Sequence, residues 1–144
     1  MGRALIVYTT RTQETLQIAD LIAEGLRFSG QEAVVLDVKA VKKETDLEGY
    51  DAYVFGSPTY HGEMLQPMKT FLFLAEKADL ANKIGGAFGA HGWSTEAQER
   101  IYQTMKTVFK MEMTSGPLLL KSASLGGGLQ MAQDYGRAIA KMMT

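Results

Sequence analysis

The segment DAYVFGSPTYHGEML (residues 51–65) passes from a short apolar run into a loop that holds a proline, an aromatic residue and two glycines. The apolar run does not alternate with polar residues, which is typical of a strand buried on both of its faces. Such strands occur in parallel sheets that are covered by helices on each side. The loop that follows lies at the carboxyl edge of the sheet, where proteins of this architecture bind their ligands.

Other apolar runs and helical patterns extend this reading over the rest of the chain. Strands are predicted at RALIVY (3–8), AVVLDV (33–38), DAYVFGS (51–57), KIGGAFGA (83–90) and GPLLLKS (116–122). Helices are predicted over 14–26, 64–77, 94–110 and 128–143, whereas the polar segment 40–48 fits neither pattern. The alternation predicts an α/β fold in one domain, residues 1–144, with a doubly wound, five-stranded parallel sheet and helices on both faces.

Composition narrows the possible functions. The chain has 144 residues, 46% of them hydrophobic, with 15 basic and 16 acidic residues and no basic block, so neither nucleic acid nor a membrane surface is an expected partner. It has no cysteine, so redox chemistry would need a bound organic cofactor. We predict no metal site. The start of the chain lacks the long apolar segment of a signal peptide, and no run approaches the roughly 20 apolar residues of a membrane helix, so a cytoplasmic location is expected.

The loop after the first strand, YTTRTQET (8–15), places Thr10, Thr12 and Thr15 at the start of a helix. Hydroxyls and free backbone N–H groups at a helix N-terminus favour an anion such as phosphate. The alternative is that one threonine caps the helix and the others are ordinary turn residues. Neither a Walker motif nor GxGxxG is present, which disfavours a nucleoside triphosphate or a dinucleotide.

The loops GSPTYHG (56–62) and GAHGWST (89–95) each carry a large aromatic residue at the same edge of the sheet. Tyr60 and Trp93 could enclose a flat ring between them by stacking and apolar burial. Alternatively, each is a half-buried surface aromatic.

Together, TRTQET, GSPTYHGEM and GAHGWSTEA resemble the flavodoxins, most closely the flavodoxin-like domains of flavo-diiron proteins. The resemblance covers essentially the whole chain and implies a short-chain member with strand order 2-1-3-4-5. It also implies a noncovalent flavin mononucleotide (FMN), with its phosphate on the 10–15 loop and its ring between the 57–62 and 89–94 loops.

The phosphate pattern T-x-T-G-x-T of the family falls on Thr10, Thr12 and Thr15, and Gln13 replaces its glycine. Glycine takes positive φ at little steric cost, so the question at Gln13 is whether its backbone can adopt the same conformation. The resemblance implies cofactor contacts from three sets of residues: Thr10, Arg11, Thr12, Gln13, Glu14 and Thr15; Ser57, Pro58, Thr59, Tyr60, His61 and Gly62; and Gly89, Ala90, His91, Gly92 and Trp93.

Three of these residues have more specific expectations. The resemblance implies that the His61–Gly62 peptide turns its carbonyl toward flavin N5 on reduction, in a turn like type II with Gly62 at the position of positive φ. His91 could donate to the O2 or N1 edge of the flavin, or could simply face solvent.

The function expected is an FMN-binding carrier that moves single electrons between redox partner proteins and needs no catalytic residue. The near-neutral charge predicts weaker electrostatic steering of those partners than in acidic flavodoxins. The alternatives are an FMN-dependent reductase of a quinone or small oxidant, and a module of this fold without flavin. A receiver-like signalling module is a further alternative. It would need acidic residues at the end of strand one and a phospho-acceptor Asp at the end of strand three, where this chain has Tyr8-Thr9-Thr10 and Gly56-Ser57.

Overall fold

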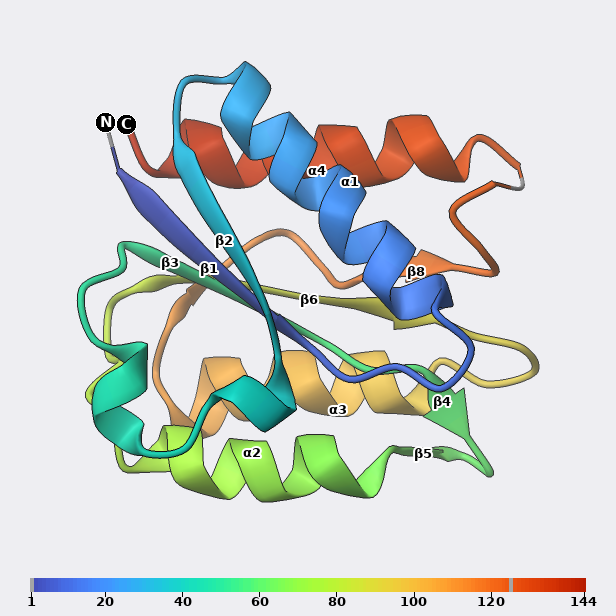
Figure 1. Ribbon diagram of the computed structural model, residues 1–144, viewed down its shortest axis with the longest axis horizontal. Coiled ribbons are helices and arrows are strands. Elements are labelled where there is room, and N and C mark those ends of the chain that lie inside the picture. Colours follow the sequence, from blue (N-terminus) through green and yellow to red (C-terminus); the bar gives the residue numbers. More distant parts are fainter. Residues whose placement is uncertain (1, 125) are drawn as a thin grey trace.

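A parallel sheet lies between two pairs of helices (Figure 1). The structure, a computed structural model, describes residues 2–124 and 126–144, so residues 1 and 125 of the predicted domain lie outside it. The sheet contains β1 (Arg3–Tyr8), β2 (Glu32–Asp37), β3 (Ala52–Gly56), β6 (Ile84–Ala90), β7 (Glu112–Met113) and β8 (Leu118–Leu120). Its order is β2-β1-β3-β6, with β7 and β8 both paired to β6 and every pair parallel. The predicted order 2-1-3-4-5 is confirmed, with β7 and β8 together in the fifth place.

The helices cover both faces of the sheet, as predicted. Figure 1 shows α1 (Glu14–Phe28) and α4 (Gly128–Met142) on one face, and α2 (Gln66–Glu76) and α3 (Glu96–Gln103) on the other. The hairpin β4 (Thr59–Tyr60) and β5 (Glu63–Met64) lies at the carboxyl edge of the sheet. The ambiguous segment 40–48 contains the end of one short 3₁₀ helix, η1 (Val38–Ala40), and all of another, η2 (Glu44–Leu47).

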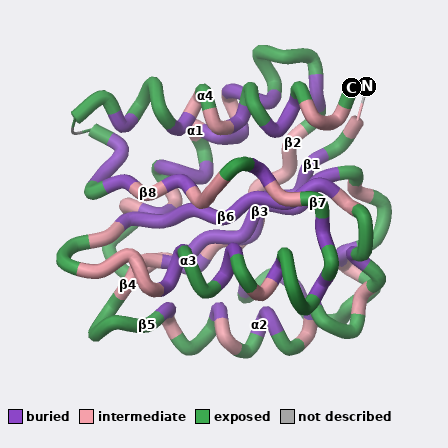
Figure 2. Tube along the Cα trace, turned by 180° about the vertical axis from the view of Figure 1, so that it is seen from behind, coloured by how far each residue is buried: buried purple, intermediate pink, exposed green. Residues whose placement is uncertain are grey.

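Apolar residues on both faces of the strands explain the three layers. In β1, Leu5 and Val7 pack into the cluster under α2 and α3, whereas Ala4 and Ile6 pack into the cluster under α1 and α4. All four are fully buried, and Figure 2 shows the central strands as buried along nearly their whole length. Because helices cover both faces of the sheet, a ligand can reach it only at the ends of the strands. In this architecture ligands bind outside the carboxyl ends.

The fifth strand differs from its prediction. Residues 116–122 were expected as one strand, but only Leu118–Leu120 pairs as β8, after the separate pair of residues in β7. Pro117 has no N–H to donate to a ladder. The Tyr135 hydroxyl fills the gap, since it accepts from Ala87 N–H at 3.1 Å and donates to Gly116 C=O at 2.9 Å.

The helix predicted over 94–110 also has different bounds. α3 ends at Gln103 and continues as a π-helical turn, η3 (Thr104–Val108), in which Phe109 N–H donates to Thr104 C=O. The other three helices match their predicted positions to within two residues.

Candidate functional site

A cleft of about 370 Å³ opens where β1, β3 and β6 end. The loops after these three strands form its walls, as the topology predicts. Its lining consists of Thr10, Arg11, Thr12, Glu14, Thr15, Pro58, Thr59, Tyr60, Ala90, His91 and Gly92. Every one of these residues belongs to the set predicted from the sequence.

The first loop contains two polar atoms without partners. The hydroxyls of Thr10 and Thr15 are buried and have no hydrogen-bond partner within residues 2–124 and 126–144. A buried polar group without a partner typically costs about 1–3 kcal/mol, so its presence beside a cleft indicates a ligand that would satisfy it. Both threonines belong to the cleft lining, and a phosphate oxygen could accept a hydrogen bond from a threonine hydroxyl.

The start of α1 is open in the same region. Gln13 is the N-cap residue, with no side-chain cap, and has φ 71° and ψ −3°. It therefore takes the left-handed conformation that the glycine of the family pattern would permit. The helix ladder begins with Gln17 N–H donating to Gln13 C=O, which leaves the N–H groups of residues 14–16 without acceptors inside the helix.

α3 begins at the same edge of the sheet but is capped. Glu96 N–H donates to the Ser94 hydroxyl at 3.2 Å, and Ala97 N–H donates to the Thr59 hydroxyl at 3.1 Å. Of the two helix starts, the start of α1 is therefore the better match for an anion.

The second loop is the β4–β5 hairpin, which carries Tyr60. The Arg11 guanidinium carbon lies 3.8 Å from the centre of the Tyr60 ring, and the His61 ring makes an edge contact at 4.2 Å between centroids. The Tyr60 side chain is still 43% exposed. Its ring is thus held by neighbours from two loops and remains available for a further contact.

The hairpin closes with a turn at His61 and Gly62. Tyr60 pairs with Glu63, which leaves His61 and Gly62 as a two-residue loop with φ of 52° and 77°. Positive φ at both positions defines type I′, whereas type II requires a negative φ at the first. Tight hairpins favour type I′ because its twist matches that of the strands. Gly62 has the expected positive φ, and the type II-like turn expected on flavin reduction stays a prediction.

The third loop places Trp93 in solvent. Its side chain is fully exposed, with a relative exposure of 105%, and it does not line the cleft. His91 lines the cleft and its Nδ1 lies 3.2 Å from Gly92 C=O. The predicted roles of Trp93 and His91 toward a flavin stay predictions.

The remaining predicted residues that do not line the cleft are Gln13, Ser57, His61, Gly62 and Gly89. One of them, Ser57, shapes the second loop. The buried Ser57 hydroxyl donates to Pro58 C=O and accepts from Leu65 N–H, so it fixes the course of the second loop.

One residue at this edge was missed. Gln98 is fully buried in α3 and hydrogen-bonds residues of both the second and the third loop. A signal for it existed in the sequence. Gln98 lies three and four residues before Ile101 and Tyr102, so the helical spacing places a polar amide on the buried face of the helix.

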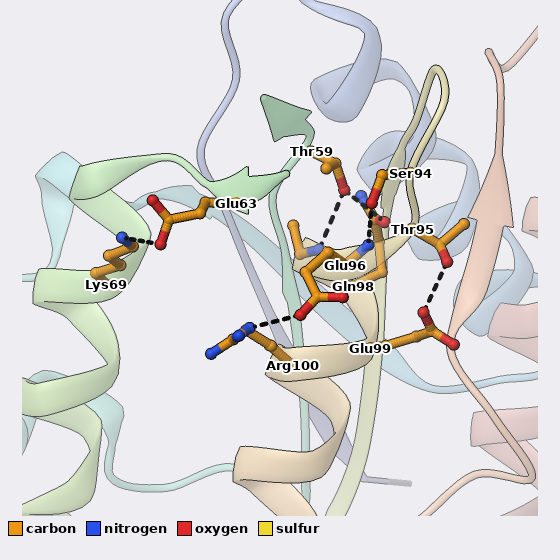
Figure 3. A network of polar contacts seen from close by, with 10 residues as sticks. Thr59, Glu63, Lys69, Ser94, Thr95, Glu96, Gln98, Glu99 and Arg100 are labelled. Carbon is orange, nitrogen blue, oxygen red and sulfur yellow. Dashed lines mark hydrogen bonds and ion pairs between the residues drawn. The ribbon is translucent and has the colours of Figure 1, made fainter. Parts of the chain in front are cut away.

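Two ion pairs lie near the cleft but outside its lining (Figure 3). Lys69 Nζ lies 2.7 Å from Glu63 and holds the pKa of that carboxyl below its usual value, and Arg100 lies 2.9 Å from Glu96. A larger groove of about 760 Å³ runs between α2 and α3, but it includes neither the loop after β1 nor the loop after β6. The smaller cleft is the better candidate because it alone contains the buried hydroxyls without partners.

The chain belongs to the flavodoxin family: residues 5–143 match the model of the flavodoxin domain. It is 29% identical over 144 residues to type A flavoprotein fprA of Rhodobacter capsulatus, covering 97% of this chain and 33% of that protein. It is 33% identical over 84 residues to a flavodoxin of Clostridium saccharobutylicum, covering 58% and 52% of the two chains. The chain thus spans only a third to a half of these two relatives.

The fold matches that of a solved flavodoxin from the domain Archaea, with a TM-score of 0.91, 28% identity and 98% of both chains covered. None of the helices within residues 2–124 and 126–144 combines the length and apolar character that crossing a bilayer requires.

Proposed function

We propose that the cleft holds FMN with its phosphate at the 10–15 loop and its ring beside Tyr60 and the 89–93 loop. The chain is an FMN-binding electron-transfer protein of the flavodoxin family. Bound FMN supplies the redox chemistry, because its ring accepts and releases electrons. The protein binds the cofactor, orients it and sets the polarity around it.

The observation that carries this placement is the pair of buried hydroxyls, Thr10 and Thr15, at the uncapped start of α1. Hydroxyl and amide donors around a helix N-terminus match the oxygens and charge of a phosphate monoester. The left-handed backbone at Gln13 supports the same placement because it preserves the loop conformation that glycine would permit.

The ring would lie against the apolar and aromatic residues of the other two loops. Pro58, Tyr60 and Ala90 line the cleft, and Gly92 adds no side chain that would narrow it. Arg11 brings a positive charge to the same wall through its contact with Tyr60. A cation at this position favours the negative charge that arrives with an electron.

Redox partner proteins follow from this function, and we propose that they exchange electrons at the exposed edge that carries Tyr60 and Trp93. The cytoplasmic location and the single domain over residues 1–144 also stay predictions from the sequence.

Fluorescence titration of the purified, flavin-free protein with FMN and with riboflavin tests the proposal. We expect FMN to bind more tightly by several kcal/mol, since each charge-assisted hydrogen bond to the phosphate contributes about 1.5–3 kcal/mol. Thr10→Val should weaken FMN binding and leave riboflavin binding unchanged, whereas Thr70→Val on the exposed side of α2 should change neither. Equal affinity for FMN and riboflavin in the parent protein would contradict the phosphate site.

The reductase alternative is tested with the FMN-loaded protein. A carrier should show no sustained oxidation of a reduced nicotinamide in the presence of a quinone. Steady turnover of both compounds would instead favour the enzyme.

A further inference from the structure

Gln98 joins two of the three loops that form the cleft. Its side-chain Nε2 donates to Ser57 C=O at 2.8 Å and to Ala90 C=O at 3.2 Å, and its Oε1 accepts from the Thr59 hydroxyl at 3.0 Å. Gln98 is fully buried, and Figure 3 shows it in the first turn of α3 with its side chain directed toward Thr59. The Gln98 amide therefore binds the second loop through Ser57 and Thr59 and the third loop through Ala90.

These hydrogen bonds lie just beyond the last backbone hydrogen bonds between β3 and β6. The register of β3 and β6 ends at Gly56 and Phe88, followed by one more bond from Ser57 N–H to Phe88 C=O at 3.2 Å. Beyond that bond, the Gln98 amide bridges the Ser57 and Ala90 carbonyls. It therefore extends the connection between the two strands past the end of their ladder.

Gly89 makes this bridge possible. A Cβ atom there would lie 2.0 Å from the Ser57 carbonyl oxygen and 2.6 Å from Gln98 Nε2. Any other residue at position 89 would displace the amide or the loop. The Gln98 bridge therefore requires glycine at position 89.

The walls of the cleft begin at the atoms that Gln98 holds. Thr59 and Ala90 line the cleft directly, and Pro58 follows Ser57. We propose that Gln98 is a positioning residue that fixes the separation of the second and third loops and so sets the width of the slot for the flavin ring. This inference rests on the proposed FMN site, but it concerns the ring walls and not the phosphate loop.

Gln98→Met tests it, because methionine has similar length and volume but cannot make these hydrogen bonds. Dissociation constants for FMN and riboflavin should both rise by about tenfold, the effect of losing about 1.4 kcal/mol of binding energy. The ratio of the two constants should stay that of the parent, because the phosphate loop is unchanged. The visible absorption bands of the bound flavin should also broaden as the ring environment becomes less uniform.

Tyr135→Phe is the matched control. It removes hydrogen bonds to Ala87 and Gly116 on the opposite face of the sheet, away from the cleft lining. It should destabilise the protein without changing either flavin constant or the absorption bands. Binding is measured at a temperature where urea unfolding shows each variant to be folded.

The outcomes separate the two proposals. If the parent protein prefers FMN but Gln98→Met keeps both constants and the parent spectrum, Gln98 serves the fold alone and the inference is overturned. If the parent protein binds no flavin, the proposed function itself fails. Should Gln98→Met not fold, Gln98→Glu replaces it, since glutamate has the same length but lacks the N–H donors to the Ser57 and Ala90 carbonyls. Parent flavin constants and a parent spectrum in that variant would also overturn the inference.

Discussion

Gln13 occupies a backbone conformation that usually belongs to glycine. Its φ of 71° costs a residue with a Cβ about 1 kcal/mol, whereas glycine takes this conformation without that cost. We expect Gln13→Gly to raise the free energy of unfolding by up to about 1 kcal/mol in urea titrations. Gln103→Gly is the control with the opposite sign, because Gln103 is helical with φ −65° and glycine there should cost about 1 kcal/mol. A loss of stability in both variants would mean that Gln13 is not strained.

Trp93 differs from most tryptophans because its side chain is fully exposed and packs against no other residue that the structure describes. Because its side chain is fully exposed, Trp93→Ala should change the stability of the flavin-free protein by no more than about 0.5 kcal/mol. If the indole covers the bound flavin, the same variant should weaken FMN binding by about 1–3 kcal/mol in a fluorescence titration. Phe73→Ala removes another exposed aromatic, on α2, and should alter neither quantity. Unchanged FMN affinity in Trp93→Ala would remove Trp93 from the proposed site.

At the scale of elements, the interrupted fifth strand depends on Tyr135. Burial raises the pKa of Tyr135 to about 12, and its hydroxyl is the acceptor for the Ala87 N–H that no strand residue satisfies. Tyr135→Phe should therefore lower the free energy of unfolding at pH 7 by about 1–3 kcal/mol, as expected for a buried donor left without a partner. Urea titration measures this loss.

The same residue predicts how stability depends on alkaline pH. The unfolded chain loses the tyrosine proton near pH 10 and the folded protein only near pH 12, so the unfolded state binds fewer protons between these values. Stability from this group is complete below pH 10 and falls by roughly 3 kcal/mol as pH rises to 12. Tyr135→Phe should show a shallower decline over that interval. Parallel curves for the parent and the variant would contradict the assignment.

The elements that the sequence predicted well are those with a clear period or an unbroken apolar run. β3 and β6 are buried throughout, and the helical spacing of Ile18, Ile22 and Leu26 placed α1 correctly. The break at Pro117 was not predicted, because the hydroxyl that replaces the missing ladder bond comes from a residue in α4 that is distant in sequence. A side chain that replaces a strand hydrogen bond from far along the chain leaves no pattern in the local sequence.

The candidate site was predicted at the level of loops but not of the contacts between them. The motifs placed every residue of the cleft lining in the three loops, because parallel strands bring their carboxyl ends together. The type I′ turn at His61–Gly62 follows from the pairing of Tyr60 with Glu63, and the bridge of Gln98 follows from the approach of α3 to both loops. Strand pairing and helix packing depend on the tertiary structure, so the sequence of a single segment does not predict them.

For the whole molecule, ligand binding and stability should be coupled at the start of α1. Among the described residues, the Thr10 and Thr15 hydroxyls are buried without partners, and such groups lower the stability of the flavin-free protein. A ligand that binds only the folded state stabilises it by about 2.7 kcal/mol at one hundred times its dissociation constant. For a chain of 144 residues this corresponds to a rise in melting temperature of roughly 9 °C.

Thr15→Val separates the two parts of this coupling. Valine has the same shape as threonine but removes a hydroxyl that the flavin-free protein leaves unsatisfied, at a residue only 1% exposed. The flavin-free variant should therefore melt about 3 °C higher than the parent, equivalent to about 1 kcal/mol. At the same FMN concentration its further rise should be smaller than the parent's, since the proposed site loses one hydroxyl donor to the phosphate. Differential scanning calorimetry measures both shifts, and a lower melting temperature for flavin-free Thr15→Val would mean that the hydroxyl is satisfied within the fold.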